Sequence, residues 1–375
     1  MKSWVAMAGF LAVALVAGEG RTATIRVNDE AWIDLKGFLQ AWGQATEDGA
    51  PDGESMGKEL FVRRARLMLT GQVLDGVGFL ISTDASNIGK NGDVAGTLGV
   101  QDAFGSIRLI PGYLHADVGL FLPPFLHHGT QSAASLVGLD VHGPVYRYLP
   151  VSGAWRDTGV QLRAGLFADR LQLRAAAFNG LRGKVDPAGD AATRNPDDAL
   201  RYTGSLRVNL LEPEPDFFTH GTSLGKRRVL SFGVAGDTQT NGALSADGRV
   251  EEYRAYGADV YLDLPFTEDR ELVFQAMAAR WWNGEDALNS GVSAFVEGSF
   301  RFGQQAPYVV WERFYSDAGR SDAEIVHVGL THYVRGHSFN VKADLALERT
   351  EVTGGPAFDD VPWRTVGTVG IQLYL

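Results

Sequence analysis

Hydrophobic and polar positions alternate along short stretches of this chain. In the stretch ELFVRRARLMLTG, Phe61 and Leu69 fall on one face, whereas Arg64 and Arg66 fall on the other. A period of two is expected of a β-strand, because successive side chains point to opposite faces of the sheet. Arg63 breaks the pattern, and we expect it to reach an interface from near the strand end, as long basic side chains do.

The same alternation recurs along the chain, and turn or loop residues separate the alternating segments. No stretch has a convincing helical period. The pattern predicts about sixteen strands, near residues 32–44, 58–72, 75–85, 99–110, 112–122, 157–166, 169–179, 201–211, 227–238, 251–264, 270–282, 291–302, 306–316, 323–334, 338–350 and 364–375.

Repeated strands of about ten residues with one apolar and one polar face are typical of a transmembrane β-barrel. A soluble β-sandwich also alternates and is the alternative. Two features favour the barrel. The polar face carries charges from many strands, and aromatic residues lie near strand ends, as interfacial girdles require: Tyr202, Trp281, Trp282, Trp311 and Tyr333. We therefore predict an all-β fold, a transmembrane antiparallel β-barrel of about sixteen strands.

The first residues have the pattern of an export signal. A basic start is followed by the apolar run WVAMAGFLAVALVAG and small residues. We predict a signal peptide over residues 1–20 and a barrel over residues 21–375; an N-terminal membrane anchor is the alternative. The last strand ends in TVGIQLYL with alternate apolar positions, although Leu375 stands where outer-membrane proteins usually have Phe or Trp.

One connection, residues 123–156, is long and lacks alternation. Loops of this length are usually functional. Because it contains Leu, Val, Tyr and Trp, we predict that it folds into the barrel as a constriction loop; a loop covering the mouth is the alternative. Its candidate site residues are His127, His128 and Arg147, and a solvated histidine pair is favoured over a metal site.

Composition excludes several classes of function. The chain has 375 residues, no Cys and a net charge of −11, which argue against thiolate chemistry and general nucleic-acid binding. No GxSxG or HExxH motif is present. His115 and Asp117 share a strand face and could form an acid/base pair, but we expect neither an enzyme nor a cofactor or metal.

The polar faces predict a charged lumen. Basic residues come mostly from the first half of the chain: Arg64, Arg66, Arg108, Arg163, Arg174, Arg201 and Arg207. Acidic residues come mostly from the second half: Asp102, Asp117, Asp259, Asp263, Glu297, Asp344 and Glu348. We predict a basic wall facing an acidic one. The alternative is that these charges pair across neighbouring strands and only hydrate the wall.

Residues from Phe61 to Pro213 resemble the phosphate-selective porin O and P family. The resemblance is carried by the arginine-rich stretch FVRRARLMLTG, by GLFLPPF before the long connection, and by RDTGVQL, AAAFNG and RYTGSLRVNLLEP. It implies a sixteen-stranded outer-membrane porin of a Gram-negative bacterium, commonly a homotrimer, with an inward constriction loop. Phosphate-selective members use an arginine ladder and a lysine ring, and lysines are sparse here.

We therefore expect passive diffusion of small hydrophilic solutes, with mild anion preference ahead of true phosphate specificity. The expected partners are outer-membrane lipid, small anionic or polar solutes and further copies of the chain. Two alternatives stay open. The first is a scaffold barrel around a periplasmic or electron-transfer partner, which needs a lumen without a plug. The second is a barrel hydrolase.

Overall fold

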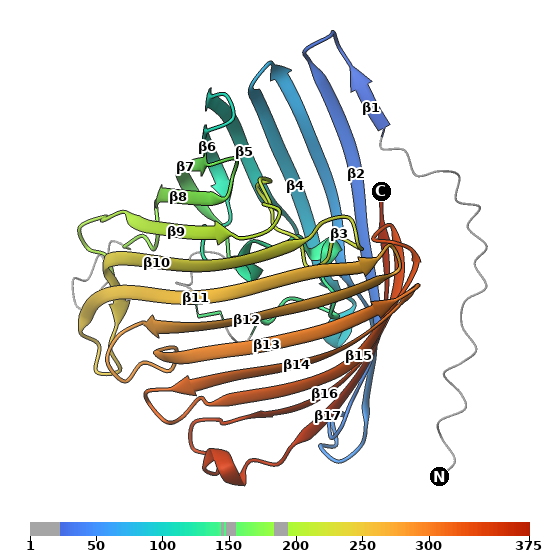
Figure 1. The fold of residues 1–375 in the computed structure, drawn as a ribbon. Helices are drawn as coiled ribbons and strands as arrows, with labels where there is room; N and C mark the ends of the chain where they lie inside the picture. Colours follow the sequence, from blue (N-terminus) through green and yellow to red (C-terminus); the bar gives the residue numbers. More distant parts are fainter. Residues whose placement is uncertain (1–22, 144–145, 148–154, 184–193) are drawn as a thin grey trace.

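The structure is a computed structural model that describes residues 23–143, 146–147, 155–183 and 194–375. Sixteen antiparallel strands, β2 to β17, form a closed barrel in which each strand pairs with the next and β17 pairs with β2 (Figure 1). The all-β barrel predicted from alternation is confirmed. The predicted signal peptide lies outside the described residues.

The strands follow the predicted ranges closely. Their bounds are β2 Trp32–Thr46, β3 Gly57–Leu74, β4 Val77–Ile88, β5 Leu98–Ile110, β6 Leu114–Phe121, β7 Asp157–Leu166, β8 Leu171–Phe178, β9 Arg201–Asn209, β10 Val229–Leu244, β11 Val250–Thr267, β12 Arg270–Trp282, β13 Gly291–Phe302, β14 Gln305–Ser316, β15 Ala323–Arg335, β16 Phe339–Thr350 and β17 Arg364–Tyr374. An additional short strand, β1 (Ala23–Arg26), pairs with the start of β2.

The helical elements that lie wholly within the described residues are single 3₁₀ turns, namely η1 (Lys90–Gly92), η2 (His128–Thr130), η3 (Ala133–Ser135) and η5 (Phe358–Asp360). No helix among the described residues is long and apolar enough to span a membrane.

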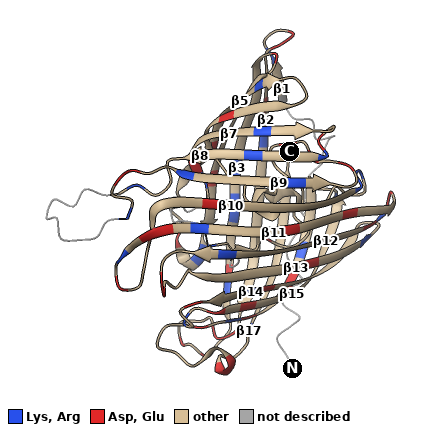
Figure 2. Cartoon of the chain, turned by 60° about the vertical axis from the view of Figure 1, so that its left-hand side comes forward, with Lys and Arg blue, Asp and Glu red and all other residues tan. Residues whose placement is uncertain are grey.

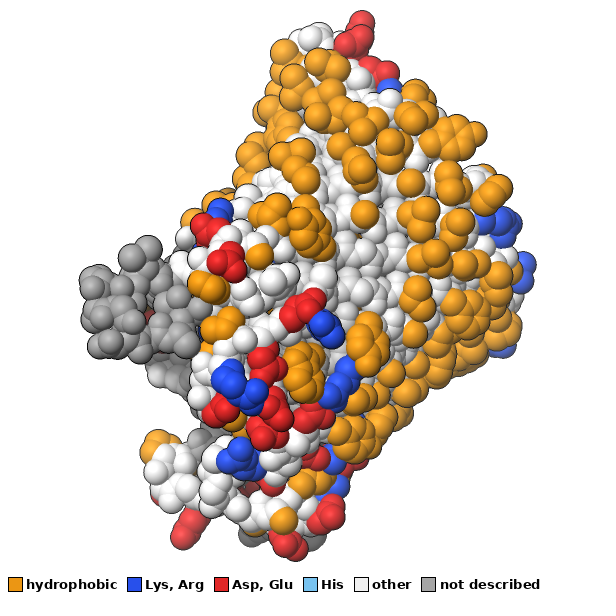
Figure 3. Space-filling view, turned by 90° about the vertical axis from the view of Figure 1, so that its left-hand side faces the viewer, with side chains coloured by type: hydrophobic (Ala, Val, Ile, Leu, Met, Phe, Trp, Pro, Cys, Tyr) orange, Lys and Arg blue, Asp and Glu red, His pale blue; other side chains and the backbone are white. Residues whose placement is uncertain are grey.

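The two faces of the strands differ as the alternation predicts. Leu67, Ile81 and Val160 are exposed on the outside, whereas Arg64 and Gln161 are buried on the inside. Exposed apolar side chains cover a broad band of the outer surface (Figure 3). A band of this kind matches the hydrocarbon of a bilayer, and the polar inner face does not need to contact lipid.

A β-bulge changes the direction of Arg63. Gln40 pairs with Arg64, and the next residue of β2, Ala41, pairs with Val62, so Arg63 is the extra residue on β3. A bulge bends the strand and redirects its side chains. Arg63 therefore points into the barrel, and the expectation that it reaches an interface from the apolar face is wrong.

Two aromatic residues expected in the interfacial girdles face the lumen instead. Trp281 has an exposed fraction of 0% and donates from its indole Nε1 to Ser293 Oγ at 2.7 Å, and Tyr333 is 4% exposed. The sequence analysis placed both wrongly, because an aromatic residue near a strand end can face either lipid or the packed interior of the barrel. Tyr202, in contrast, is exposed on the outside.

Two connections fold inward from opposite ends of the barrel. The inner loop, which is the described part of residues 123–147, follows β6, and the inner turn, residues 210–228, follows β9. They meet in the lumen, where Gln131 forms a parallel bridge with Thr219. The described part of the inner loop is largely buried, the inner turn is mostly partly buried, and both bond to inward-facing side chains of the strands. The inner turn was not predicted.

Candidate channel lining

Polar side chains of the wall bind the backbone of the inner loop. Lys342 on β16, which is 2% exposed, donates to the carbonyl oxygens of Leu136 (2.7 Å) and Gly138 (2.6 Å). Gln372 on β17 donates to the carbonyl oxygen of Ala134 at 2.8 Å. Satisfying the carbonyl groups of a buried loop removes the cost of taking them out of water. The wall thus fixes the loop across the lumen.

The inner loop also packs an apolar core against β10 to β14. Phe125 lies against Trp281 with ring centroids 5.1 Å apart, and both side chains are fully buried. The core further contains Leu126, Tyr146, Ala235, Ala243, Tyr253, Ala255, Met277, Ala279, Phe295, Phe314 and Ala323. Burial of a large apolar side chain stabilises by about 1.5–3 kcal/mol. This side of the lumen is therefore filled with protein.

His142 fastens the far end of the described loop segment. Its Nε2 lies 2.8 Å from Glu297 on β13, and its Nδ1 lies 2.6 Å from Glu312 on β14. Burial alone would lower the pKa of His142, but the carboxylates of Glu312 and Glu297 outweigh burial and raise that pKa to about 10. The ring is an imidazolium at neutral pH, and both nitrogens donate.

His127 and His128 have separate roles. His127 Nε2 donates to Glu214 of the inner turn at 2.7 Å, and its Nδ1 accepts from Gln131 at 3.0 Å. This tautomer is neutral, and burial lowers the pKa of His127 accordingly. His128 Nε2 accepts from the backbone N–H of His142 at 3.0 Å. The two buried rings therefore have different hydrogen-bond partners, and the solvated histidine pair expected from the sequence is wrong.

Among the residues that the structure describes, no group of three His, Asp or Glu side chains could hold a metal ion.

The third residue singled out in the loop, Arg147, places its guanidinium carbon 4.1 Å from the ring centroid of Phe314 on β14. Its cation therefore lies over an aromatic face of the packed side and not in an open channel.

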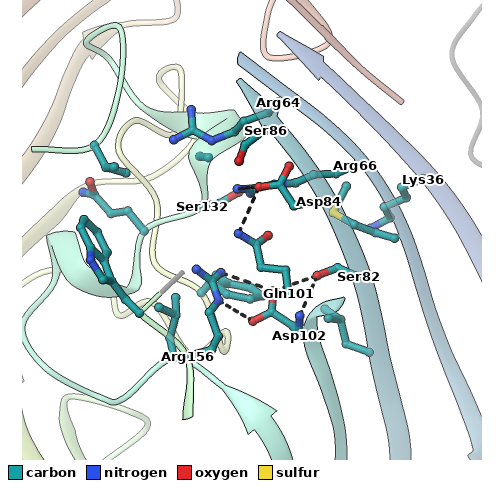
Figure 4. Close-up of a pocket in the computed structure, with 18 of the residues that line it drawn as sticks. Lys36, Arg64, Arg66, Ser82, Asp84, Ser86, Gln101, Asp102, Ser132 and Arg156 are labelled. Carbon is teal, nitrogen blue, oxygen red and sulfur yellow. Dashed lines mark hydrogen bonds and ion pairs between the residues drawn. The ribbon is translucent and has the colours of Figure 1, made fainter. Parts of the chain in front are cut away.

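A cavity of about 310 Å³ remains on the opposite side of the inner loop, along β2 to β5 (Figure 4). Its cationic residues are Lys36, Arg63, Arg64, Arg66 and Arg156, and its carboxylates are Asp84 and Asp102. Apolar side chains share the lining, namely Met68, Leu80, Leu122, Val141, Trp155 and Phe218. The lining is amphipathic, with the cations concentrated on β3.

Each arginine on this wall has a carboxylate partner. Arg66 NH2 lies 3.0 Å from Asp84, and Arg63 and Arg64 both bind Asp140 of the inner loop. Burial would raise the pKa of Asp140, but Arg64 and Arg63 hold it well below its usual range. Arg156 lies 3.1 Å from Asp102. Five cationic side chains therefore face three carboxylates, which leaves an excess of two positive charges.

Most of the other predicted basic residues pair with acids on the adjacent strand or on the strand beyond it. The pairs are Arg163 with Asp117 at 2.6 Å, Arg207 with Asp259 at 2.7 Å, and Arg201 with Asp237 and Asp157. Bands of basic and acidic positions therefore follow each other from β7 to β11 (Figure 2). On these strands the lumen has cross-strand pairs instead of an uncompensated basic wall.

Two predicted arginines have other surroundings. Arg174 on β8 donates to the carbonyl oxygens of Asp216 and Phe217 of the inner turn, both at 2.9 Å. Arg108 on β5 pairs with Asp75 in the adjacent β3–β4 turn, where the carboxylate is 71% exposed. Arg174 thus supports the inner turn, and Arg108 lies at the rim and outside the cavity.

The predicted acidic residues of the second half hold protein groups. Asp263 on β11 accepts from the backbone N–H of Ser223 at 2.7 Å, and Glu297 accepts from His142. Asp344 on β16 accepts from Tyr308 at 2.8 Å and contacts His327. Glu348 pairs with Arg364 at the end of β17. Asp102 and Asp117, in contrast, lie on the basic side.

Several lining residues were missed by the sequence analysis. Asp140 and Arg156 belong to the long connection and carry no alternation signal, and Lys36 and Asp84 are single charges on predicted strands. A usable signal existed for Glu312, because QAPYVVWERFYS on β14 is apolar on both faces and still carries a buried charge. In a membrane barrel, a strand that is apolar on both faces indicates lipid on one side and packed protein on the other.

No protein-family model matches the chain, and no curated protein sequence matches it. Solved structures do. OmpF of Salmonella typhi, in complex with daunomycin, is 14% identical with a TM-score of 0.63, and the match covers 94% of this chain and 100% of that one. The chain has the fold of the outer-membrane porins.

Two further porin-fold structures match. The anion-selective porin of Comamonas acidovorans is 12% identical with a TM-score of 0.57, over 92% of this chain and 100% of that one. The trimer form of OmpT, an outer membrane protein of Vibrio cholerae, is 13% identical with a TM-score of 0.52, over the same shares. Identities this low show the fold, and the closer resemblance to the phosphate-selective family stays a prediction.

Proposed function

We propose that this protein is an outer-membrane porin through which small hydrophilic solutes diffuse, with a mild preference for anions. The observation that carries the proposal is the cavity beside β2 to β5, where five cationic side chains face three carboxylates. In a narrow, partly desolvated passage, two excess positive charges attract anions more strongly than they would in bulk water. The similarity to an anion-selective porin supports the same preference.

The path lies to one side of the barrel. Because the inner loop packs against β10 to β14, the cavity of about 310 Å³ is left at β2 to β5, and a smaller cavity of about 180 Å³ remains between the loop and β14 to β17. The inner loop acts as the constriction, and Arg63, Arg64 and Arg66 form the basic side of the passage. Arg163, Arg201 and Arg207 are paired with carboxylates and contribute little net charge.

The scaffold alternative does not fit this interior. A barrel that surrounds a partner protein needs an empty lumen, but the inner loop and inner turn occupy it with buried contacts. The hydrolase alternative receives no support from a specific constellation. His115 and Asp117 lie on the same strand face, but Asp117 is bound by Arg163 and Gln161.

Location and assembly belong to the same proposal. Residues 1–20 direct export and are removed, the mature chain resides in the outer membrane of a Gram-negative bacterium, and it assembles as a homotrimer, as the trimer form of OmpT does. Intact mass of the protein from an outer-membrane fraction checks the cleavage, and light scattering in detergent checks the assembly. A monomeric mass would overturn the trimer and leave the channel proposal standing.

The test of the channel is single-channel recording of refolded protein in planar bilayers under a KCl gradient. We expect stable conductance and a reversal potential biased towards chloride. Arg249→Gln is the control, since Arg249 lies in an exposed ion pair with Asp247 and Glu285, away from the cavity. A potassium-biased reversal potential would contradict the anion preference, and a folded barrel without conductance would contradict the porin.

A further inference from the structure

The lining of the cavity also bears on the kind of anion. We propose that the cavity beside β2 to β5 binds small organic carboxylates with an apolar body in preference to inorganic phosphate. This inference rests on the proposed channel and names the solute class of the same site. It follows from three properties of the lining: its apolar part, the carboxylates that accompany its cations, and its unmet hydrogen bonds.

The apolar part of the lining comes from several elements. Leu80 projects inward from β4, Leu122 and Trp155 flank the inner loop, and Phe218 belongs to the inner turn. Trp155 holds its backbone at φ 59°, in the left-handed region that bulky residues rarely occupy. Apolar side chains gain nothing from a phosphate ion, but they remove the hydrocarbon part of an organic anion from water.

The carboxylates on the basic wall disfavour a multiply charged ion. Arg66 is bound to Asp84, Arg156 to Asp102, and both Arg63 and Arg64 to Asp140. A phosphate dianion would have to displace these partners or lie beside them at a repulsive distance. A monocarboxylate carries half that charge and is repelled less by the carboxylates that stay in place.

Four buried polar atoms of the cavity lining have no hydrogen-bond partner among the described residues. Two come from the wall, Arg66 Nε and Asp84 Oδ1, and two from the inner loop, His128 Nδ1 and Gln131 Oε1. Because His128 Nε2 accepts from His142, the proton of the neutral ring is on Nδ1, so His128 is a donor. His128 is 4% exposed.

The four side chains border the same space, but these atoms are themselves enclosed, and His128 Nδ1–H and Gln131 Oε1 are complementary to each other. Buried polar groups are rarely left unpaired. Arg66 Nε–H is therefore left as the donor for a carboxylate oxygen of the solute. Lys36, for which the described residues show no ion pair, adds charge at the cavity edge.

The experiment compares three probes on the refolded full-length channel at matched ionic strength: phenylacetate, acetate and inorganic phosphate. We expect phenylacetate to block the open-channel current at a concentration about tenfold lower than either acetate or phosphate, as the burial of an apolar ring predicts. Stronger block by phosphate, or equal block by all three, would overturn the solute class while the anion-biased conductance still supported the porin.

Two variants and a matched control localise the effect. Leu80→Ala and Phe218→Ala remove apolar contacts from different elements and should weaken block by phenylacetate roughly fivefold, with acetate unchanged. Ile81→Ala is the control, because Ile81 follows Leu80 on β4 and is 43% exposed on the outer face. Equal weakening by Leu80→Ala and Ile81→Ala, or none by Leu80→Ala and Phe218→Ala, would overturn the proposal.

Binding can also be measured without current. Isothermal titration calorimetry of the protein in detergent micelles should show phenylacetate binding that Arg66→Gln weakens and Arg249→Gln does not. This measurement separates the two proposals if the barrel folds and does not conduct. Binding in that case retains the carboxylate site and removes the channel, whereas conductance without preferential phenylacetate binding retains the channel and removes the site.

Discussion

The two sides of the lumen follow different physical rules. Beside β10 to β14, the inward faces contribute Tyr253, Trp281 and Phe314, and the inner loop covers them as the interior of a soluble domain would. Beside β2 to β5, the inward faces carry Arg64 and Asp84 and border open space. The same barrel therefore has a packed wall that holds the inner loop and a polar wall that the inner loop does not cover.

The difference teaches how a channel can be narrow and still have a fixed shape. A loop held only by polar side chains would compete with water for every contact. Here the apolar contacts on the packed side provide the attachment, and the hydrogen bonds of Lys342 and Gln372 determine where the loop lies. The open side can then be specialised for solutes without supporting the loop by itself.

The largest effect on the packed side of the lumen is expected from Trp281→Ala. We expect it to lower the free energy of unfolding by about 3–5 kcal/mol, because it leaves a cavity in a fully buried cluster. Urea unfolding followed by far-UV circular dichroism measures the change. Trp282→Ala is the matched control, since Trp282 is the next residue and is only partly buried; equal losses for the two variants would contradict the internal core.

The second prediction concerns pH and the attachment of His142. Its pKa is raised to about 10 in the folded protein, above its unfolded value of 6.5. Its contribution is therefore fully present below pH 6.5 and is lost as pH rises through about 10. The loss is on the order of 5 kcal/mol. Urea midpoints measured from pH 6 to pH 10.5 should fall for the native protein more than for His142→Gln.

Parallel pH profiles for the native protein and His142→Gln would contradict the charged attachment. The groups that face His142 are Glu297 and Glu312 on the wall and His128 within the loop, with His327 beyond Glu312. Current recordings over the same range should show noisier open channels at high pH, because the end of the loop is then bound less firmly.

On the open side, Arg64→Gln tests charge more than packing. We expect a loss of about 2 kcal/mol from the weaker hold on Asp140 and a shift of the reversal potential away from chloride. Arg163→Gln, on a paired arginine outside the cavity, should shift the reversal potential less. A larger shift for Arg163→Gln would mean that selectivity is determined along β6 and β7 and not at β3.

The smallest expected effect is that of Leu80→Ala on stability. Leu80 is partly buried and borders the cavity, so its truncation opens no enclosed void, and we expect a loss of about 1 kcal/mol in urea unfolding. A loss as large as that of Trp281→Ala would mean that the side chains beside β2 to β5 are packed as tightly as those beside β10 to β14.

The strands were predictable because each needs only the local alternation of its own residues. Sixteen alternating segments correspond to β2–β17, and the inward direction of Arg64 and Arg66 follows from parity. Arg63 was placed wrongly because a bulge shifts parity by one residue, and the pairing with β2 that produces the bulge is not visible in the sequence of β3.

The partners of the charged residues could not be predicted in the same way. Arg207 pairs with Asp259 and Arg201 pairs with Asp237 through the register of β9 to β11, over separations of 52 and 36 residues. Residues 210–228 contain proline and polar residues, which predict a surface link, and their burial depends on the space left beside the inner loop. The pairing of these charges and the position of residues 210–228 depend on tertiary contacts, which the local sequence does not show.

The seam between β2 and β17 has a consequence for folding. Gln40 Nε2 donates to Gln372 Oε1 at 3.0 Å across a separation of 332 residues. Contacts between distant parts of a chain form slowly, because the entropy of the intervening chain is lost before they add stability. We therefore expect closure of the barrel at the β2–β17 seam to be the slow step of folding.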